Sequence, residues 1–351
     1  MAGSMKAMIV SEHGGPEVIK PGEMPMPEAG VGEVVVKVAA CALNHLDVWV
    51  RAGIPGIKLP IILGCDVAGE IAAVGPGVKH LKVGEKVLAD PGLSCGVCKQ
   101  CVAGQENICR QYHILGAGRN GGYAQFVSIP AGNCLPIPDG LDMTQAAAVP
   151  LVFITAWHML VTRVALQMKE TVLVVGGGSG VGSAAIQIAK LKHARVIATV
   201  GDEEKAKLAK SLGADEVIIH SKEKIAERVK VLTDKQGVDV VFEHVGPAVF
   251  EDCLMSLSTG GRLVTCGATT GPQAPVDITR LFMKHQAIYG SIMGNRREFM
   301  DLLPFFAKAK DGSAPKLKPV IAKTFNWQEA AEAHRYMEAR QHFGKIVLTG
   351  Y

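Results

Sequence analysis

Aromatic residues are scarce in this sequence, at 5% of its 351 residues, and neither sign of charge dominates. Lys and Arg together number 37 and Asp and Glu number 33, and the small positive surplus forms no basic block. A nucleic-acid surface needs clustered basic and aromatic side chains, so we expect no nucleic-acid partner. The contents of 48% apolar and 20% charged residues exclude wholesale disorder and fibrous structure.

The sequence also lacks an apolar run long enough for a membrane span. The longest run, residues 146–161, is interrupted by Pro150, Thr155 and His158. The first residues, MAGSMKAMIV, do not have the charged-then-apolar layout of a secretory signal. We therefore expect a cytoplasmic protein without a membrane partner, whose nine cysteines do not form a disulfide framework.

The character of the chain changes near Pro150. Before it, strand-like runs such as residues 34–40 and 67–74 alternate with closely spaced turns, which predicts a β-rich domain. After it, six short apolar runs alternate with helical patterns, which predicts a doubly wound α/β domain with a parallel sheet. Six is the number of strands in a complete dinucleotide-binding sheet. The six expected strands are residues 172–175, 196–200, 217–220, 238–243, 262–266 and 288–292.

A glycine-rich turn follows the first of these six strands. Residues 171–191 read TVLVVGGGSGVGSAAIQIAKL, so a buried strand enters the turn and an amphipathic helix leaves it. Glycine permits the tight turn and the close approach of a pyrophosphate, and the helix N-terminus supplies N–H groups. Ser179 stands where the usual fingerprint has its middle glycine. We interpret the turn as a dinucleotide site, and not as a purely structural turn, because the full series of strands accompanies it.

The choice between NAD and NADP depends on the end of the second strand. An acidic residue there would bind the ribose 2′-hydroxyl of NAD, and a basic residue would suit the 2′-phosphate of NADP. The strand ends at Val200, with Asp202 two residues later and Lys205 beyond it. Asp202 could equally be the N-cap of the following helix. The pattern favours NADP(H) over NAD(H) and leaves both open.

Four cysteines lie close together in a polar, glycine-containing loop. Cys95, Cys98, Cys101 and Cys109 have the spacing of a closed, tetrahedral zinc site. The alternatives are two disulfides or four free thiols. Four thiolates leave no open coordination position, so we expect one structural Zn²⁺ that holds the loop and takes no part in chemistry.

A four-cysteine lobe upstream of a nucleotide-binding half resembles the zinc-type medium-chain dehydrogenase/reductase superfamily, which includes alcohol dehydrogenases and quinone oxidoreductases. Shorter similarities are the segments GCDVAG at 64–69, GGRLV at 260–264 and GKIVL at 344–348. The resemblance covers essentially the whole chain. It implies a GroES-like catalytic domain of residues 1–152 and 293–351, with the zinc lobe at 92–112. It also implies a Rossmann NAD(P)-binding domain of residues 153–292 and assembly as a homodimer or homotetramer.

The sequence departs from this family at the catalytic zinc. Asn44 stands in place of the first cysteine ligand, Leu46 in place of the hydroxyl residue that follows it, and Cys65-Asp66 in place of His-Glu. The remaining cysteine ligand falls at about Leu151. Cys65 and Asp66 are two ligands, and a catalytic zinc needs three from the protein. A rebuilt metal site with His45 as third ligand stays open as an alternative.

The segment from Asn44 to Gly53 instead resembles the zinc-free quinone oxidoreductase branch. That resemblance implies that Asn44 hydrogen-bonds the substrate oxygen and that Asp47 orients its neighbours. Alternatively, Asn44 satisfies backbone groups of its loop, and Cys65 is a small buried apolar side chain. We expect the catalytic residues to be Asn44, Asp47, Cys65 and Asp66.

The resemblance also implies a set of cofactor contacts. His45 and Lys345 match basic positions that face the phosphates. Val200 and Lys205 lie at and just after the end of the second strand. Val245, Gly246 and Gly267 match loops that line the nicotinamide. Gly290 and Ser291 lie at the sixth strand. The remaining positions of the set are Gly177, Ser179, Gly180, Val181 and Gly182.

Three functions compete at this point. The leading one is an NAD(P)H-dependent reductase of quinones or α,β-unsaturated carbonyls, which works by hydride transfer to a small-molecule substrate without a catalytic zinc. The second is an alcohol dehydrogenase with a rebuilt metal site. The third is a nucleotide-binding scaffold protein without turnover, which the lack of basic and aromatic clustering disfavours.

Overall fold

The structure is a computed structural model that describes residues 3–309 and 311–351. It divides into two compact units. Unit 1 comprises the described residues up to Leu151 together with Gly294–Tyr351, and unit 2 comprises Val152–Met293. The expected domain boundaries lie within one residue of this division. Within the described residues, no helix is both long enough and apolar enough to cross a membrane.

Unit 1 is built around an antiparallel sheet with strand order β10-β6-β5-β3-β18-β17, in which β9 pairs with β3 and β17 runs parallel to β18. A three-stranded sheet, β2-β1-β4, and the small pair β7-β8 complete it. Its strands are β1 (Ser4–Val10), β2 (Ile19–Pro25), β3 (Glu33–Ala42), β4 (Ile61–Ile62), β5 (Asp66–Val74), β6 (Lys86–Ala89), β7 (Gly92–Leu93), β8 (His113–Ile114), β9 (Phe126–Pro130), β10 (Cys134–Pro136), β17 (Ile321–Asn326) and β18 (Lys345–Thr349).

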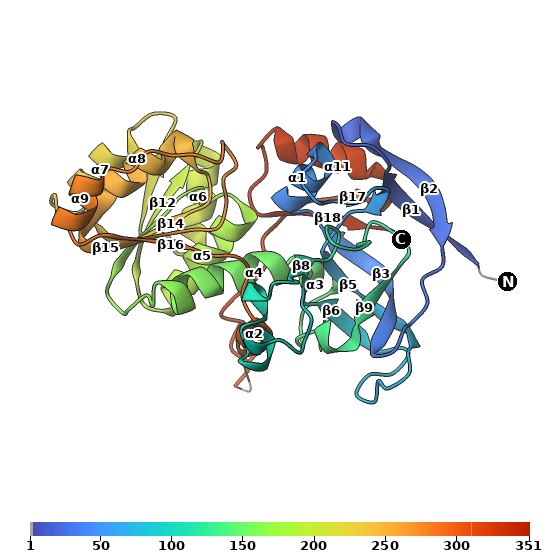
Figure 1. The fold of residues 1–351 in the computed structure, drawn as a ribbon. Helices are drawn as coiled ribbons and strands as arrows, with labels where there is room; N and C mark the ends of the chain where they lie inside the picture. The colour runs from blue at the N-terminus through green and yellow to red at the C-terminus, as the bar shows by residue number, and fades with distance from the viewer. Residues whose placement is uncertain (1–2, 310) are drawn as a thin grey trace. The chain divides into compact units, whose positions relative to one another are not determined.

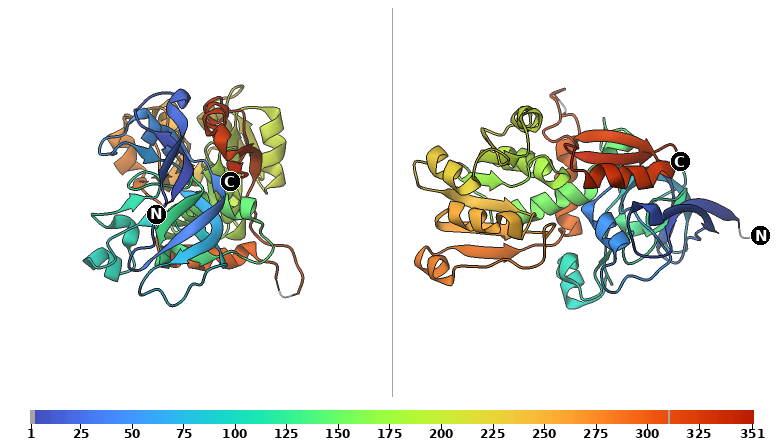
Figure 2. Two further views of the ribbon diagram at one scale, coloured as in Figure 1. Left: turned by 90° about the vertical axis from the view of Figure 1, so that its right-hand side faces the viewer. Right: turned by 90° about the horizontal axis from the view of Figure 1, so that it is seen from above.

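Short helices connect and cover these sheets. The last of them, α11, contacts β2 and the turn before it, so the first and last segments of the chain lie side by side in unit 1 (Figure 2). The α-helices are α1 (His45–Ala52), α2 (Lys99–Val102), α3 (Met143–Ala147), α10 (Arg296–Leu302) and α11 (Ala330–Glu338). The 3₁₀ turns are η1 (Pro16–Val18), η2 (Glu106–Ile108), η3 (Ala131–Asn133), η5 (Leu303–Phe306) and η6 (Trp327–Glu329).

Strand register in unit 1 brings three chain segments to one point. Ala42, at the end of β3, pairs with Asp66 at the start of β5 and with Val347 in the middle of β18, and the next N–H, that of Leu43, donates to the Ile346 oxygen. Because both neighbours run antiparallel to β3, the end of β3 meets the first residues of β5 and β18. The loop after β3 therefore lies beside residues that are far away in the sequence.

Unit 2 is a six-stranded parallel sheet with the order β13-β12-β11-β14-β15-β16. This is the order of the doubly wound dinucleotide-binding fold, with a topological switch between β11 and β14. Figure 1 shows the sheet with α7 and α8 on one of its sides. The strands are β11 (Thr171–Val174), β12 (Arg195–Val200), β13 (Glu216–Ile219), β14 (Val238–Glu243), β15 (Leu257–Thr265) and β16 (Ala287–Gly290).

The helices of unit 2 pack against the sheet through small and branched apolar side chains. Ile225 and Val229 of α7 and Cys253 of α8 form one core with residues of the sheet such as Leu173 and Val241. The α4 helix (Pro150–Trp157) crosses the boundary between the units and continues as the π-helical segment His158–Arg163. The others are α5 (Gly180–Leu191), α6 (Glu203–Ser211), α7 (Ile225–Leu232), α8 (Pro247–Ser256) and α9 (Ile278–Met283). The expected fold class is confirmed.

Candidate functional site

The glycine-rich turn lies at the carboxyl end of β11, where the sheet switches direction. Gly176 has a φ of +63°, which favours glycine, and a Cβ on Gly182 would lie 2.2 Å from the Gly176 oxygen. Ser179 is the N-cap of α5, and its Oγ accepts a hydrogen bond of 2.9 Å from the Gly182 N–H. The first turn of a helix leaves backbone N–H groups without intrahelical partners. The turn therefore suits a pyrophosphate.

His244 contacts this turn from another segment, and the sequence did not reveal it. It follows β14, across the switch point, and its Nε2 lies 3.1 Å from the Ser179 Oγ. Burial lowers the pKa of His244, so the ring is neutral at pH 7 and Nε2 can accept the Ser179 proton. Ser179 Oγ then accepts a hydrogen bond from the Gly182 N–H and donates one to His244 Nε2. A histidine directly after a strand is the signal that could have identified it.

The end of β12 carries a second group that the sequence only partly revealed. Asp202 is the N-cap of α6, and its Oδ1 accepts the Lys205 N–H at 2.8 Å. The N-cap interpretation of Asp202 is thus confirmed. His220, at the end of β13, lies near Gly201, and burial together with the Lys205 charge lowers its pKa. Lys205 and His220 place two basic side chains at the end of β12.

The other expected cofactor residues of unit 2 follow β14, β15 and β16. The Glu243 carboxylate accepts hydrogen bonds from the N–H groups of Val245 and Gly246 and thereby shapes the loop after β14. A Cβ on Gly267 would lie 2.8 Å from the His244 oxygen, so the loops after β14 and β15 touch. Gly290 is the last residue of the edge strand β16, and the N–H of Ser291 after it donates to the Thr265 oxygen at 2.9 Å.

In unit 1 the segments joined by the sheet register form a buried polar cluster, which we call the Asn44 cluster: Asn44, Cys65, Asp66 and Lys345. Asn44 Nδ2 donates to Asp66 Oδ2 at 2.8 Å and to the Cys65 sulfur at 3.3 Å. Both Nδ2 hydrogens therefore have acceptors inside the protein. This geometry does not support the expected hydrogen bond between Asn44 and a substrate oxygen.

Lys345, which was expected to face the phosphates, lies in the Asn44 cluster of unit 1. Its ammonium lies 2.6 Å from Asn44 Oδ1, 2.6 Å from the Leu43 oxygen and 2.9 Å from Asp66 Oδ2. The side chain is 3% exposed. The first residue of β18 is brought to the end of β3 by the strand register, so its ammonium meets the buried Asp66 carboxylate. His45, the other basic residue expected at the phosphates, begins α1 and is partly buried.

Asp47 holds the two loops of the Asn44 cluster together. Its Oδ2 accepts the Asn44 N–H at 2.7 Å and its Oδ1 accepts the Gly64 N–H at 3.0 Å. Burial raises the pKa of Asp47 to about 6 despite these hydrogen bonds. The Tyr123 hydroxyl donates to Asp47 Oδ2 at 3.4 Å and lies 3.2 Å from Nε2 of the buried His334.

The Asn44 cluster does not fit a catalytic zinc. Leu151 presents only its backbone N–H, which donates to Asp66 Oδ1 at 2.8 Å. Burial and the nearby Asp66 and Asp47 charges raise the pKa of Cys65 well above its usual range, so the sulfur is a protonated thiol. Among the described residues, the sole group of three or more metal-binding side chains is the four-cysteine cluster, so Cys65, Asp66 and His45 form no such group.

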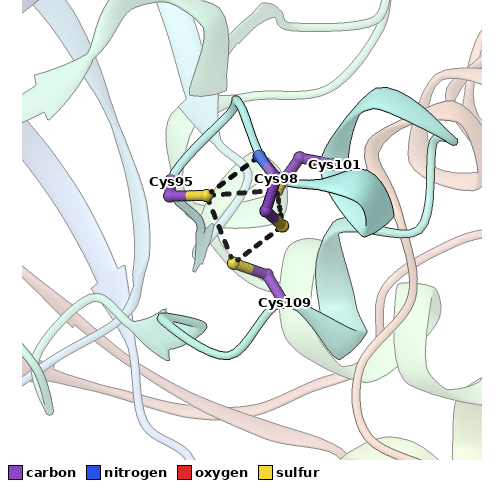
Figure 3. Close-up of side chains that lie close together, drawn as sticks. All are labelled: Cys95, Cys98, Cys101 and Cys109. Carbon is purple, nitrogen blue, oxygen red and sulfur yellow. Dashed lines mark hydrogen bonds between the residues drawn. The ribbon is translucent and has the colours of Figure 1, made fainter.

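The four cysteines of the lobe converge in space (Figure 3). Their sulfur–sulfur distances are 3.6 Å (98–101 and 95–109), 3.7 Å (98–109) and 3.9 Å (95–101). A tetrahedron with Zn–S bonds of about 2.3 Å has edges of roughly 3.8 Å. Backbone N–H groups of Val97 and Cys98 lower the pKa of Cys95 to about 6, which favours a thiolate. The arrangement fits a tetrahedral zinc.

A parallel sheet with this turn at its switch point defines a protein that works with a dinucleotide. Comparison with known proteins is consistent with that class and specifies it. Residues 30–139 match the family model described as alcohol dehydrogenase GroES-like domain, and residues 180–308 match the model described as zinc-binding dehydrogenase. The chain belongs to the zinc-containing medium-chain dehydrogenase/reductase superfamily and is an oxidoreductase.

Individual relatives cover nearly the whole chain. The NAD-dependent alcohol dehydrogenase of Sulfolobus acidocaldarius is 34% identical over 98% of this chain and 99% of its own length. The acryloyl-coenzyme A reductase of Metallosphaera sedula is 31% identical over 98% and 100%, and the quinone oxidoreductase of Pseudomonas aeruginosa 32% over 98% and 99%. A solved NAD-dependent alcohol dehydrogenase is 43% identical, with a TM-score of 0.94 over 99% of this chain and 100% of that one. The scaffold interpretation is therefore wrong.

Proposed function

We propose that the protein is an NAD(P)H-dependent reductase of quinones or α,β-unsaturated carbonyls that works without a catalytic metal. The observation that carries this proposal is the composition of the Asn44 cluster. Its protonated Cys65 thiol, its amide and the aliphatic Leu151 replace the ligands of a catalytic zinc. The proposal includes one structural zinc at Cys95, Cys98, Cys101 and Cys109, supported by their tetrahedral spacing.

The chemistry of the substrate follows from the missing metal site. A simple ketone needs its oxygen polarised before it accepts hydride, and a zinc ion supplies that polarisation. A quinone or an enone spreads the incoming charge over a conjugated system and needs less help at one oxygen. Two relatives are named for such acceptors, the acryloyl-coenzyme A reductase and the quinone oxidoreductase. They support a conjugated substrate for this chain.

The residues present fit a nicotinamide dinucleotide, which supplies the hydride when it is bound. The turn from Gly177 to Gly182 would hold the pyrophosphate, with Ser179 fixed by Gly182 and His244. The Lys205 ammonium would hold a 2′-phosphate, and the neutral His220 ring near Gly201 would donate a hydrogen bond to it, which favours NADP(H). Within unit 1, Asp47 fixes the loops that carry Asn44 and Cys65, and the Asn44 cluster keeps its own polar groups satisfied.

An alcohol dehydrogenase activity is the second candidate, and the identity of 43% to a solved NAD-dependent alcohol dehydrogenase favours it. One assay separates the two. The full-length protein is mixed with NADPH or with NADH and with quinones, enones, enoyl thioesters, saturated aldehydes or saturated ketones. We expect cofactor oxidation with conjugated acceptors and little with saturated ones, and deuterium from 4-deuterated cofactor at the β-carbon of an enone. Oxidation with saturated carbonyls alone would establish the second candidate.

We also propose that the chain assembles as a homodimer or homotetramer. Helix α9, which precedes the edge strand β16 in the chain, exposes large apolar side chains, with Ile278 71%, Phe282 65% and Met283 66% exposed. Exposed apolar groups beside an open strand edge are typical of an interaction surface. Light scattering on the purified protein at several concentrations would measure the subunit number.

A further inference from the structure

The ammonium of Lys345 occupies the middle of the Asn44 cluster. An ammonium has three N–H donors, and three oxygens surround this one, those of Asn44 Oδ1, Leu43 O and Asp66 Oδ2. The distances are 2.6, 2.6 and 2.9 Å. Every donor of Lys345 therefore has an acceptor, and none needs a ligand from outside.

The cluster is closed to water as well as saturated. The Lys345 side chain is 3% exposed, the Asp66 side chain 0%, and Asn44 is 5% exposed. A buried charge is costly unless a partner compensates it, so the positive charge of Lys345 and the negative charge of Asp66 stabilise each other. A buried divalent cation at Asp66 would lie against this ammonium and be repelled by it.

Two of the three oxygens around Lys345, those of Asn44 and Asp66, and the Cys65 sulfur beside them belong to the positions where the family pattern has catalytic zinc ligands. We propose that Lys345 is the resident cation of the Asn44 cluster, which excludes a divalent metal and fixes the side chains of Asn44 and Asp66. Lys345 is thus a positioning residue whose charge replaces that of the metal. The inference deepens the proposed function and rests on it for the role of the cluster in turnover.

Cys65 supplies a test of this assignment. Its thiol lies 4.0 Å from Asp66 Oδ1 and 3.3 Å from Asn44 Nδ2, so it is adjacent to the carboxylate that Lys345 neutralises. Without the ammonium, Asp66 and Cys65 would offer an oxygen and a sulfur ligand, with backbone or amide oxygens next to them. A metal that binds there would release the thiol proton to solvent and form a metal–thiolate bond.

The experiment adds Co²⁺ to the zinc-replete, full-length protein and follows the cobalt–thiolate absorption together with the bound metal per chain. We expect no added cobalt site in the wild type. In Lys345→Ala we expect one additional equivalent of bound Co²⁺ with thiolate absorption. The double variant Lys345→Ala/Cys65→Ser should lose that absorption, and Lys345→Arg should keep the wild-type behaviour because it keeps the charge.

The matched control is Lys190→Ala, because Lys190 also binds a carboxylate, that of Asp215 at 2.9 Å, far from any cysteine in the sequence. It should bind no additional cobalt, which also controls for exchange at the four cysteines. A second cobalt site in the wild type that Cys65→Ser abolishes would overturn the proposal, even if Lys345→Ala does not fold. So would a folded Lys345→Ala without the additional site. Cobalt absorption and bound metal per chain do not depend on turnover. A failure of the proposed quinone or enone reductase activity would therefore leave this test unaffected.

Discussion

Nη1 of Arg51 donates a hydrogen bond to Nδ1 of His334 at 3.2 Å, and both residues are buried. Arg has no acceptor, so Nδ1 carries no proton and the proton of the neutral ring is on Nε2. The ring then donates to the Tyr123 hydroxyl, which donates to Asp47. The donors from Arg51 to Asp47 all point in one direction, and they end at the carboxylate that fixes the Asn44 loop.

Within this series of hydrogen bonds, we expect His334 to make a contribution to stability that is sensitive to acid. Burial and the Arg51 charge lower the pKa of His334 from 6.5 to about 3. The unfolded chain therefore binds an extra proton between these values, and the contribution of His334 to stability is lost as the pH falls below 6.5. Asp47 has the opposite sign, because its pKa rises from 3.8 to about 6 and its contribution is lost as the pH rises.

We expect His334→Gln to flatten the loss of stability in acid, because glutamine can accept from Arg51 and donate to Tyr123 without titrating. Between pH 7 and pH 4.5 the wild type should lose about 2.5 kcal/mol more than the variant. Urea unfolding at both pH values measures this difference. Parallel losses in the two proteins would show that His334 is not the group responsible.

The four-cysteine lobe predicts a dependence on zinc. Cys98→Ser should remove most of the bound zinc and lower the midpoint of thermal unfolding, since a structural zinc stabilises the fold that binds it. Elemental analysis and calorimetry are the measurements. Cys266→Ser, a cysteine outside the lobe, is the control and should keep one zinc per chain. Full zinc content in Cys98→Ser would contradict the site.

We expect Lys205 to contribute to a preference for NADPH over NADH. If its ammonium meets the 2′-phosphate, Lys205→Ala should raise the KM for NADPH about tenfold, which corresponds to about 1.4 kcal/mol, and leave the KM for NADH nearly unchanged. Lys207→Ala is the matched control, because Lys207 lies in the same helix and pairs with the exposed Glu204. Equal effects of Lys205→Ala on both cofactors would remove the argument for NADP(H).

Ser179 predicts a difference between two small substitutions. Ser179→Ala removes the cap of α5 and should cost about 1 kcal/mol, whereas Ser179→Gly should cost only a few tenths. Both variants lose the Oγ hydrogen bonds to Gly182 and His244, so the difference between them reports the N-cap preference for glycine over alanine, and their common effect on cofactor affinity reports the loss of Oγ. Urea unfolding and cofactor titration measure the two quantities. Equal destabilisation would mean that the cap is not the stabilising element.

Local patterns in the sequence predicted the sheet of unit 2, the glycine-rich turn and the cysteine lobe. Each depends on residues that are close in sequence, such as Gly176 with Gly182, or on the alternation of strands and helices. The Asn44 cluster depends instead on strand register between segments 279 residues apart, Asp66 and Lys345. No local pattern contains that register, so the sequence alone does not predict that Lys345 contacts Asp66.

The same limit applies to His244 and His334. Each looks unremarkable in the sequence, and each gains its significance from a partner on a distant element, Ser179 for one and Arg51 for the other. The contacts of Asn44 depend on a distant segment in the same way. Its amide could be placed in a loop from the sequence, but the acceptors that use both Nδ2 hydrogens are Cys65, directly before β5, and Asp66, the first residue of β5.

The position of Lys345 at the start of β18 has a consequence for synthesis. Unit 2 is a continuous segment, and all of its strands are synthesised before β17 and β18. Unit 1 is different, because β18, which pairs with β3, is synthesised last. Lys345, the only ammonium partner of Asp66 in the Asn44 cluster, belongs to this strand. A nascent chain that stops before Lys345 therefore holds a buried carboxylate without its counter-charge, and the last strand is the step that completes unit 1.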